Sequence, residues 1–171
     1  MLELLQHRRS IRTFTDEPVS QENIDSLLKA ALLAPSSMGK KPVECIVVRN
    51  KETIDRLKTY KKHGTTPLGT APLAIVVIAD GQKSDVWVED ASIVSILIQL
   101  EAEKLGLGST WIQLRRREGD SGPSEEAFRQ ELGIPEQYGV LSVVAIGHKN
   151  EQKKPYTDAD LDFTKVHYET F

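Results

Sequence analysis

Arg8-Arg9-Ser10-Ile11-Arg12-Thr13-Phe14 is the stretch around which this chain is organised. Three guanidinium groups and two hydroxyl groups fall within it, and only Ile11 and Phe14 are apolar. Arginine suits a phosphate because its planar fork donates two parallel hydrogen bonds, and Ser10 offers a further donor. Taken alone, the segment also fits a solvated basic turn, as most charge runs are. The segment alone therefore leaves two interpretations open, an anion-binding site and a solvated turn, and the rest of the sequence is needed to choose between them.

Length and composition predict one ordinary domain over residues 1–171. The net charge of −3 gives no general case for a nucleic acid or an anionic membrane as partner. The lone cysteine, Cys45, excludes an intrachain disulfide, and its apolar surroundings favour a buried structural thiol over a nucleophile. The N-terminus is charged too early for a signal peptide, so we expect a cytoplasmic protein.

The first forty residues predict two helices and a constrained loop. A short helix is expected over residues 2–7. A longer one follows an N-cap at Ser20, with apolar residues repeating at helical spacing until Pro35 stops it. Residues 35–42 contain small hydroxyls, a glycine and two prolines, which indicates a tight loop. Such a loop either faces a ligand or merely connects two elements.

Four apolar runs predict the strands, at residues 43–49, 73–79, 109–113 and 140–146. The second is uninterrupted, which is typical of a strand covered on both faces. Shorter helices are expected over residues 50–62 and 125–132, with Ser124 as N-cap of the latter and Gly133 closing it. A loop rich in Gly, Thr and Pro is expected at residues 63–70, directly after the first of these two helices.

Residues 86–105 form the longest periodic segment, and apolar side chains nearly surround it. A helix that is apolar on most sides is central to its assembly. Because a domain of this size has limited interior, we expect a second subunit to bury part of the helix surface. The tail, residues 151–171, is polar but carries several aromatic and aliphatic residues that need a surface to cover them.

This order of elements predicts an α+β or α/β fold with one sheet. No G-x-G-x-x-G motif follows the first strand, which argues against a Rossmann fold. The four His and one Cys show no metal-ligand spacing, so we expect no metal site. We assign no side-chain nucleophile or general base, and hence no catalytic residue.

Five short motifs recur in a fixed order along the chain: the Arg8–Phe14 segment with Pro18-Val19 after it, Ala34-Pro35-Ser36-Ser37 after a helix, Ala71-Pro72 before an apolar strand, Leu105–Ile112 after the long helix, and Gly147-His148-Lys149 ending the last strand. By the order and spacing of these marks, the whole chain resembles the nitroreductase family, the FMN-dependent flavoproteins. Each mark is weak alone.

The resemblance implies a three-layer α+β sandwich, with a central mixed sheet flanked by helices. It implies a homodimer with FMN at the subunit interface, the long helix packed against its mate and the tail wrapped around the partner. Carried over to this chain, Arg8, Ser10 and Lys149 resemble the phosphate ligands, and Arg9 contributes main chain. Arg12 resembles the basic residue near the pyrimidine edge. The remaining cofactor-binding positions implied are Pro35, Ser36, Ser37 and Met38 from the other subunit, and Trp111, Ile112, Gln113, Leu114 and Gly147.

The activity implied is ping-pong transfer of a hydride from NADH or NADPH, through flavin N5, to nitroaromatic, quinone or similar small acceptors. Two alternatives stay open: a specialised member such as a reductive dehalogenase, and a non-catalytic flavin-binding dimer. The amide side chain that often contacts the flavin edge is replaced here by Met38-Gly39, so Lys40 or Lys41 is expected to take its place. The run Arg115-Arg116-Arg117 is not a general family feature and weakly favours NADPH.

Overall fold

Four strands form the central sheet of the computed structural model, which describes all residues from Met1 to Phe171. Every ladder between neighbouring strands is antiparallel, and the single parallel contact is a bridge between Ser10 and Ser109. Strands 73–79, 109–113 and 140–146 of the sequence analysis are confirmed but longer, and the first ends one residue earlier. In spatial order the sheet contains β1 (Val43–Val48), β2 (Leu73–Asp80), β6 (Tyr138–His148) and β3 (Leu107–Gln113).

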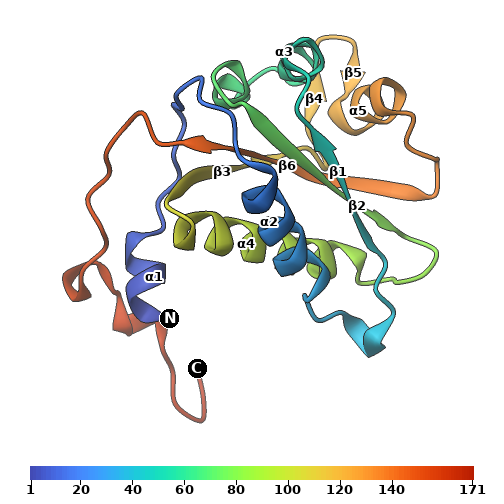
Figure 1. Cartoon of the computed structure of the whole chain (residues 1–171). Coiled ribbons are helices and arrows are strands. Elements are labelled where there is room, and N and C mark those ends of the chain that lie inside the picture. Colours follow the sequence, from blue (N-terminus) through green and yellow to red (C-terminus); the bar gives the residue numbers. More distant parts are fainter.

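Helices cover both faces of this sheet and make the expected three-layer sandwich (Figure 1). Two helices, α2 (Gln21–Leu32) and α4 (Trp87–Lys104), lie on one face. On the other face lie α3 (Lys51–Thr59) and α5 (Ser124–Leu132).

All eight residues of β2 are buried, as its uninterrupted apolar run predicts. Successive side chains of a strand point to opposite faces. Accordingly Leu73, Ile75 and Val77 join the core under α2 and α4, whereas Ala74, Val76 and Ile78 join the core under α3 and α5. The central strand therefore holds the two helical layers together.

The helix caps follow the sequence, with one exception. The Ser20 hydroxyl accepts a hydrogen bond from the Asn23 N–H at 3.2 Å, and Gly133 ends α5 in the left-handed conformation at φ +64°. Ser124 was expected to cap α5, and this prediction is wrong. Ser124 is the first residue inside the helix, Pro123 precedes it, and the buried Ser124 hydroxyl has no hydrogen-bond partner.

The long helix α4 has the predicted extent, but its polar residues are not all at the surface. Asp90 and Gln99, two polar residues of this helix, are buried. On its outer side Ile93 and Ile96 are about one-third exposed. None of the helices combines the length and apolarity that crossing a bilayer requires.

Two connections contain structure that the sequence analysis missed. Residues 63–70 include a 3₁₀ turn, η2 (Thr66–Gly69), whose Leu68 is fully buried in the core under α3. Residues 118–123 form a small hairpin of β4 (Glu118–Gly119) and β5 (Gly122–Pro123). Both depend on long-range packing, which local composition does not display.

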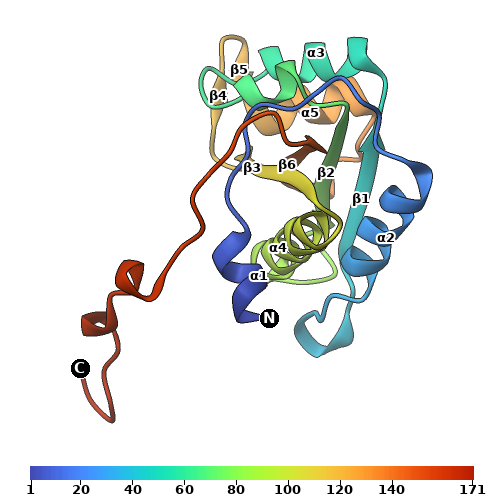
Figure 2. The same cartoon turned by 60° about the vertical axis from the view of Figure 1, so that its left-hand side comes forward.

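The tail leaves the body of the molecule beside α1 (Leu2–His7), as Figure 2 shows. Its last hydrogen bond to the body is made by Tyr156, whose N–H donates to the Gln6 carbonyl at 2.9 Å. Beyond that point its apolar side chains stay exposed: Leu161, Phe163, Val166, Tyr168 and Phe171.

Candidate functional site

The basic segment is fastened across the end of the sheet. Ser10 bridges Ser109 of the edge strand β3, and the Ile11 N–H donates to the Ser109 carbonyl at 3.0 Å. Further along, Phe14 bridges Lys149 just beyond β6. Ile11 and Phe14 are buried, so the two apolar residues of the segment anchor it in the core. The plain solvated turn is thereby excluded for this segment.

This anchoring aims the polar side chains outward. The neighbours of a buried residue in extended backbone point away from the core, so Ser10 and Arg12 flank Ile11 on the opposite side. The Arg12 guanidinium lies 3.4 Å from the Ser10 carbonyl, and the half-buried Arg8 guanidinium makes no hydrogen bond or ion pair within the chain. A hydroxyl and two cations with free donors are the chemistry that a phosphate group requires.

Glu151 fixes the segment from the other side. Its carboxylate accepts hydrogen bonds from the backbone N–H groups of Arg12 and of Thr13, the latter at 3.3 Å, and forms an ion pair with Lys153 at 2.7 Å. The Lys153 contact and the Arg12 N–H lower the pKa of Glu151 to about 2. The segment is thus held by a carboxylate that stays charged at all ordinary pH values.

Arg9 points away from Arg8. Its guanidinium donates to the Lys154 carbonyl and lies 4.1 Å from the centre of the Tyr156 ring. The side chain therefore holds the base of the tail. Only the main chain of Arg9 is available to a cofactor, which agrees with the role that the resemblance implies.

Lys149 forms an ion pair with an acidic residue of the long helix. Its ammonium group lies 2.8 Å from both carboxylate oxygens of Glu103, near the end of α4. Both residues line a cavity of about 580 Å³ together with Arg9 and Lys153. Among the expected phosphate ligands, Lys149 is therefore paired with an acid of the chain, whereas the Arg8 guanidinium has no partner within it. The sequence analysis missed Lys153 as a lining residue, although the pair Lys153-Lys154 a few residues after the last strand was visible in the sequence.

The loop at residues 35–42 lies far from the basic segment of the same subunit. The Ser37 N–H donates to the Asp90 carboxylate at 2.8 Å, at the start of α4, whereas Glu103 lies near its end. The length of helix between them is about 20 Å. Met38 is 88 % exposed and has φ +51°, and the Lys40 ammonium lies 3.9 Å from the Asp85 carboxylate. The loop presents its tip outward, not toward its own basic segment.

The end of β3 offers backbone and two polar groups. Ile112 and Leu114 are buried, so their side chains are not available to a ligand. The Trp111 indole N–H donates to the Gln113 side chain at 3.0 Å, and both residues are half-buried. Next to this strand the Arg115 guanidinium lies 5.6 Å from the centre of the Trp87 ring, so one cation of the triple-Arg run packs within the chain.

Gly147 is enclosed by the protein itself. A Cβ atom at this position would lie 2.6 Å from the Pro72 ring and 3.0 Å from the Phe14 side chain. Real Cβ contacts are not this short, so glycine is required here for packing. The expectation that Gly147 approaches the cofactor gains no support from this geometry.

Comparison with known proteins agrees with this geometry. The model of the nitroreductase family matches residues 5–67 and 58–148. An FMN-dependent nitroreductase from Clostridium difficile R20291 superposes with a TM-score of 0.98 at 49 % sequence identity, over 100 % of both chains. A protein of Archaeoglobus fulgidus, provisionally named NADH dehydrogenase/NAD(P)H nitroreductase, is 39 % identical over 98 % of this chain and 97 % of its own. An FMN reductase (NAD(P)H) of Bacillus subtilis is 30 % identical over 91 % of this chain and 69 % of its own.

The sandwich and its cationic segment, together with these similarities, define the class as the NAD(P)H-dependent flavin oxidoreductases. Within that class, the chain belongs to the nitroreductase family.

Proposed function

We propose that this chain is an FMN-dependent oxidoreductase that works as a homodimer and carries a hydride from NADH or NADPH to small acceptors such as nitroaromatics and quinones. A cytoplasmic location, where reduced nicotinamides are available, belongs to the same proposal. The observation that carries it is the basic segment pinned to the edge strand, with Arg8, Ser10 and Arg12 directed outward.

The residues present fit FMN. Arg8 and Ser10 would donate to its phosphate, and Lys149 would add its charge while Glu103 holds its ammonium group. The backbone of Arg9, Trp111 and Gln113 would line the cofactor along the edge strand. Arg12 would place positive charge at the pyrimidine edge of the ring. Bound FMN supplies the redox chemistry, taking a hydride from the nicotinamide and passing it to the acceptor.

The position of the 35–42 loop supports a site shared between two subunits. In one subunit this loop precedes β1, at the far edge of the sheet from β3. Three strand spacings separate these edges, about 14 Å. The partner subunit's loop, residues Pro35 to Met38 with Lys40, would complete the site against the basic segment. Ile93 and Ile96 on α4, with the exposed Leu2 and Leu5 of α1, supply apolar surface for such a dimer.

The test is the affinity of Arg8→Ala for FMN and for riboflavin, which lacks the phosphate. Losing a charged hydrogen-bonded contact costs roughly 1.5–3 kcal/mol, so FMN affinity should fall by about ten- to a hundredfold. Riboflavin affinity should change little, and because Arg8 has no partner within the chain, unfolding should not change. Arg56→Ala is the matched control: Arg56 lies on α3, its side chain is 51 % exposed, and the Glu131 carboxylate with which it pairs keeps its hydrogen bond from the Tyr60 hydroxyl. Unchanged FMN affinity in Arg8→Ala would refute the phosphate assignment.

A further inference from the structure

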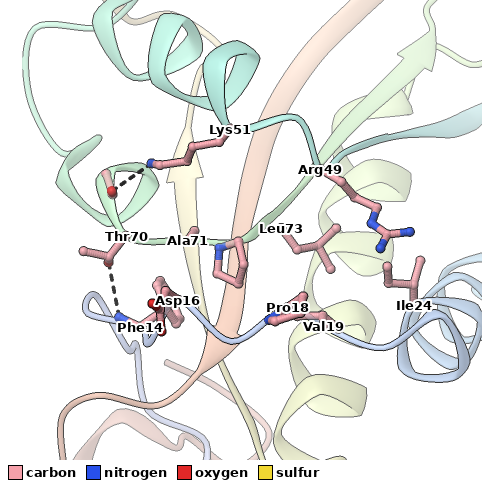
Figure 3. Close-up of a pocket in the computed structure, with 12 residues that line it drawn as sticks. Phe14, Asp16, Pro18, Val19, Ile24, Arg49, Lys51, Thr70, Ala71 and Leu73 are labelled. Carbon is pink, nitrogen blue, oxygen red and sulfur yellow. Dashed lines mark hydrogen bonds between the residues drawn. The ribbon is translucent and has the colours of Figure 1, made fainter.

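The two ends of β1 differ in the acidic residues that they bury. Where β1 ends and β2 begins lies a pocket of about 510 Å³. Its apolar surface is supplied by Phe14, Pro18, Val19, Ile24 and Leu73. Figure 3 shows Arg49 and Lys51 on one side of this pocket and Asp16 on the other. Asp16 is the only acid among the lining residues and is exposed, so the pocket buries no carboxylate.

The two most deeply buried acidic residues of the chain, Asp80 and Asp90, lie near the start of β1. Asp80 serves its own turn, because its carboxylate accepts from the Gln82 N–H at 2.9 Å and from the Lys83 N–H at 3.3 Å. Its N–H also donates to the carbonyl of Pro42, the last residue of the loop 35–42, at 2.9 Å. The Asp90 carboxylate has no partner in its own turn, so its burial needs another reason.

Asp90 joins the start of α4 to two other segments. One carboxylate oxygen, Oδ1, accepts from the Ser37 N–H at 2.8 Å, and Oδ2 accepts from the Ser84 hydroxyl at 3.1 Å. Asp90 is 3 % exposed and forms no ion pair. Burying a charge without a cation is costly, and an apolar side chain at this position would avoid that cost. An apolar side chain could not accept the Ser37 N–H, so the contact with the loop accounts for the carboxylate.

The loop has a backbone that depends on such a contact. Met38 and Lys41 have φ values of +51° and +45°, a region that residues other than glycine rarely adopt. Inside the loop, the Ser36 hydroxyl accepts from the Lys41 N–H at 2.8 Å. From Pro35 to Lys41, the only hydrogen bond to the rest of the chain is the one between the Ser37 N–H and Asp90. Strained backbone persists only where the surrounding contacts hold it.

We propose that Asp90 is a positioning residue, whose carboxylate fixes the loop 35–42 in the conformation that contacts the flavin ring. The inference rests on the proposed function, in which this loop completes the partner subunit's cofactor site. Ala91, Val94 and Ile98 anchor α4 in the core, so Asp90 transfers the position of the helix to the loop. Because α4 is also the helix expected at the subunit interface, the same hydrogen bond places the loop relative to the partner.

The experiment compares two variants of Asp90 that differ in one hydrogen-bond acceptor. Asp90→Leu keeps the approximate size of the side chain but accepts no hydrogen bond, whereas Asp90→Asn keeps an acceptor for the Ser37 N–H. Titration of FMN and of riboflavin with apoprotein, followed by flavin fluorescence, gives the affinities. Asp90→Leu should weaken both flavins equally, by about tenfold, because the loop contacts the ring and not the phosphate. Asp90→Asn should stay within about twofold of wild type.

Ser84→Ala is the matched control, because it removes the other hydrogen bond of the same carboxylate and leaves the loop contact in place. It should lower the stability to urea while both flavin affinities stay at the wild-type value. Equal losses of affinity in Ser84→Ala and Asp90→Leu would make Asp90 a purely structural residue and overturn the inference. Unchanged affinities in Asp90→Leu would overturn it as well and leave the proposed function intact. A wild-type protein that binds no flavin would overturn both.

A second pair of variants decides the question if Asp90→Leu does not fold. Ser37→Pro removes the N–H itself at the first position of the 3₁₀ turn η1 (Ser37–Gly39), where proline is compatible with the backbone. Ser36 before it is extended, as the residue preceding a proline should be. Ser37→Ala loses the same hydroxyl and keeps the N–H. Ser37→Pro should bind both flavins about tenfold more weakly than Ser37→Ala, and equal affinities of this pair would overturn the inference.

Discussion

The contact between Lys149 and Glu103 allows a prediction with a worked magnitude. The side chains are 30 % and 11 % exposed, and the ammonium lies 2.8 Å from the carboxylate. At an effective dielectric constant of 20, the attraction of two unit charges at that distance is about 6 kcal/mol, most of which the lost hydration offsets. We expect Lys149→Met to lower the free energy of unfolding by about 2 kcal/mol, because it leaves the Glu103 carboxylate buried without a cation.

A double-mutant cycle measured by urea unfolding checks this value. Glu103→Gln should lower the free energy of unfolding by only about 1 kcal/mol, because Lys149 can reach water. The double variant should lose little more than Glu103→Gln alone, so the two single losses exceed the double loss by a coupling energy of about 1.5 kcal/mol. The control pair is Lys104 and Glu101, also on α4 at 3.2 Å, where Lys104 is 65 % exposed. Its coupling should stay below about 0.5 kcal/mol. Equal couplings for the two pairs would refute the burial reasoning.

The same variants test the place of Lys149 in the cofactor site. If its charge acts on the phosphate, Lys149→Met weakens FMN about tenfold and leaves riboflavin binding unchanged. Equal affinities of wild type and variant for FMN would make Lys149 a purely structural residue that joins the last strand to α4.

Three further predictions follow from single contacts. The pKa of Glu151 is lowered to about 2 from its ordinary 4.5, so its stabilisation is present above pH 4.5 and is lost as pH falls to 2. The difference in unfolding free energy between wild type and Glu151→Ala should shrink over that range, and a constant difference would contradict this. Gly147→Ala should lower the free energy of unfolding by about 1–3 kcal/mol, because the new Cβ meets Pro72 and Phe14. If it instead weakens FMN binding at unchanged stability, Gly147 approaches the cofactor. Burial, aided by Glu44, raises the pKa of the Cys45 thiol to about 11, so iodoacetamide at pH 8 should label it much more slowly than a thiol of the urea-unfolded chain. Equal rates would show an accessible thiolate.

Local pattern predicted most of the elements. The apolar run at 73–79 and the helical spacing of apolar residues at 86–105 are both too long and too regular for a loop. The first forms the expected strand and the second the expected helix. Errors occurred where the local signal was ambiguous. Pro123 stands at the cap position and Ser124 is the first residue of the helix, so the sequence analysis placed the cap one residue too late.

The site was predicted less completely than the fold, and the reason is spatial. Arg8 and Arg9 are adjacent in sequence and look equivalent there. In the structure the Arg9 side chain packs against the tail, whereas Arg8 keeps its donors free, and the burial of Ile11 fixes this orientation of the segment. Likewise no local signal joins Lys149 to Glu103, which are distant in sequence and meet because α4 runs under the sheet.

The sequence by itself determined most of the secondary structure, the covered central strand, the basic character of the segment from Arg8 to Phe14 and the surplus of apolar side chains in the tail. Those properties depend on residue type and on spacing over a few residues, which the sequence displays directly. Only the tertiary structure decided which cations have free donors, that Gly147 is needed for packing, and that an apolar pocket with a cationic side lies where β1 ends. Those properties arise from contacts between distant segments, and the folded backbone alone brings such segments together.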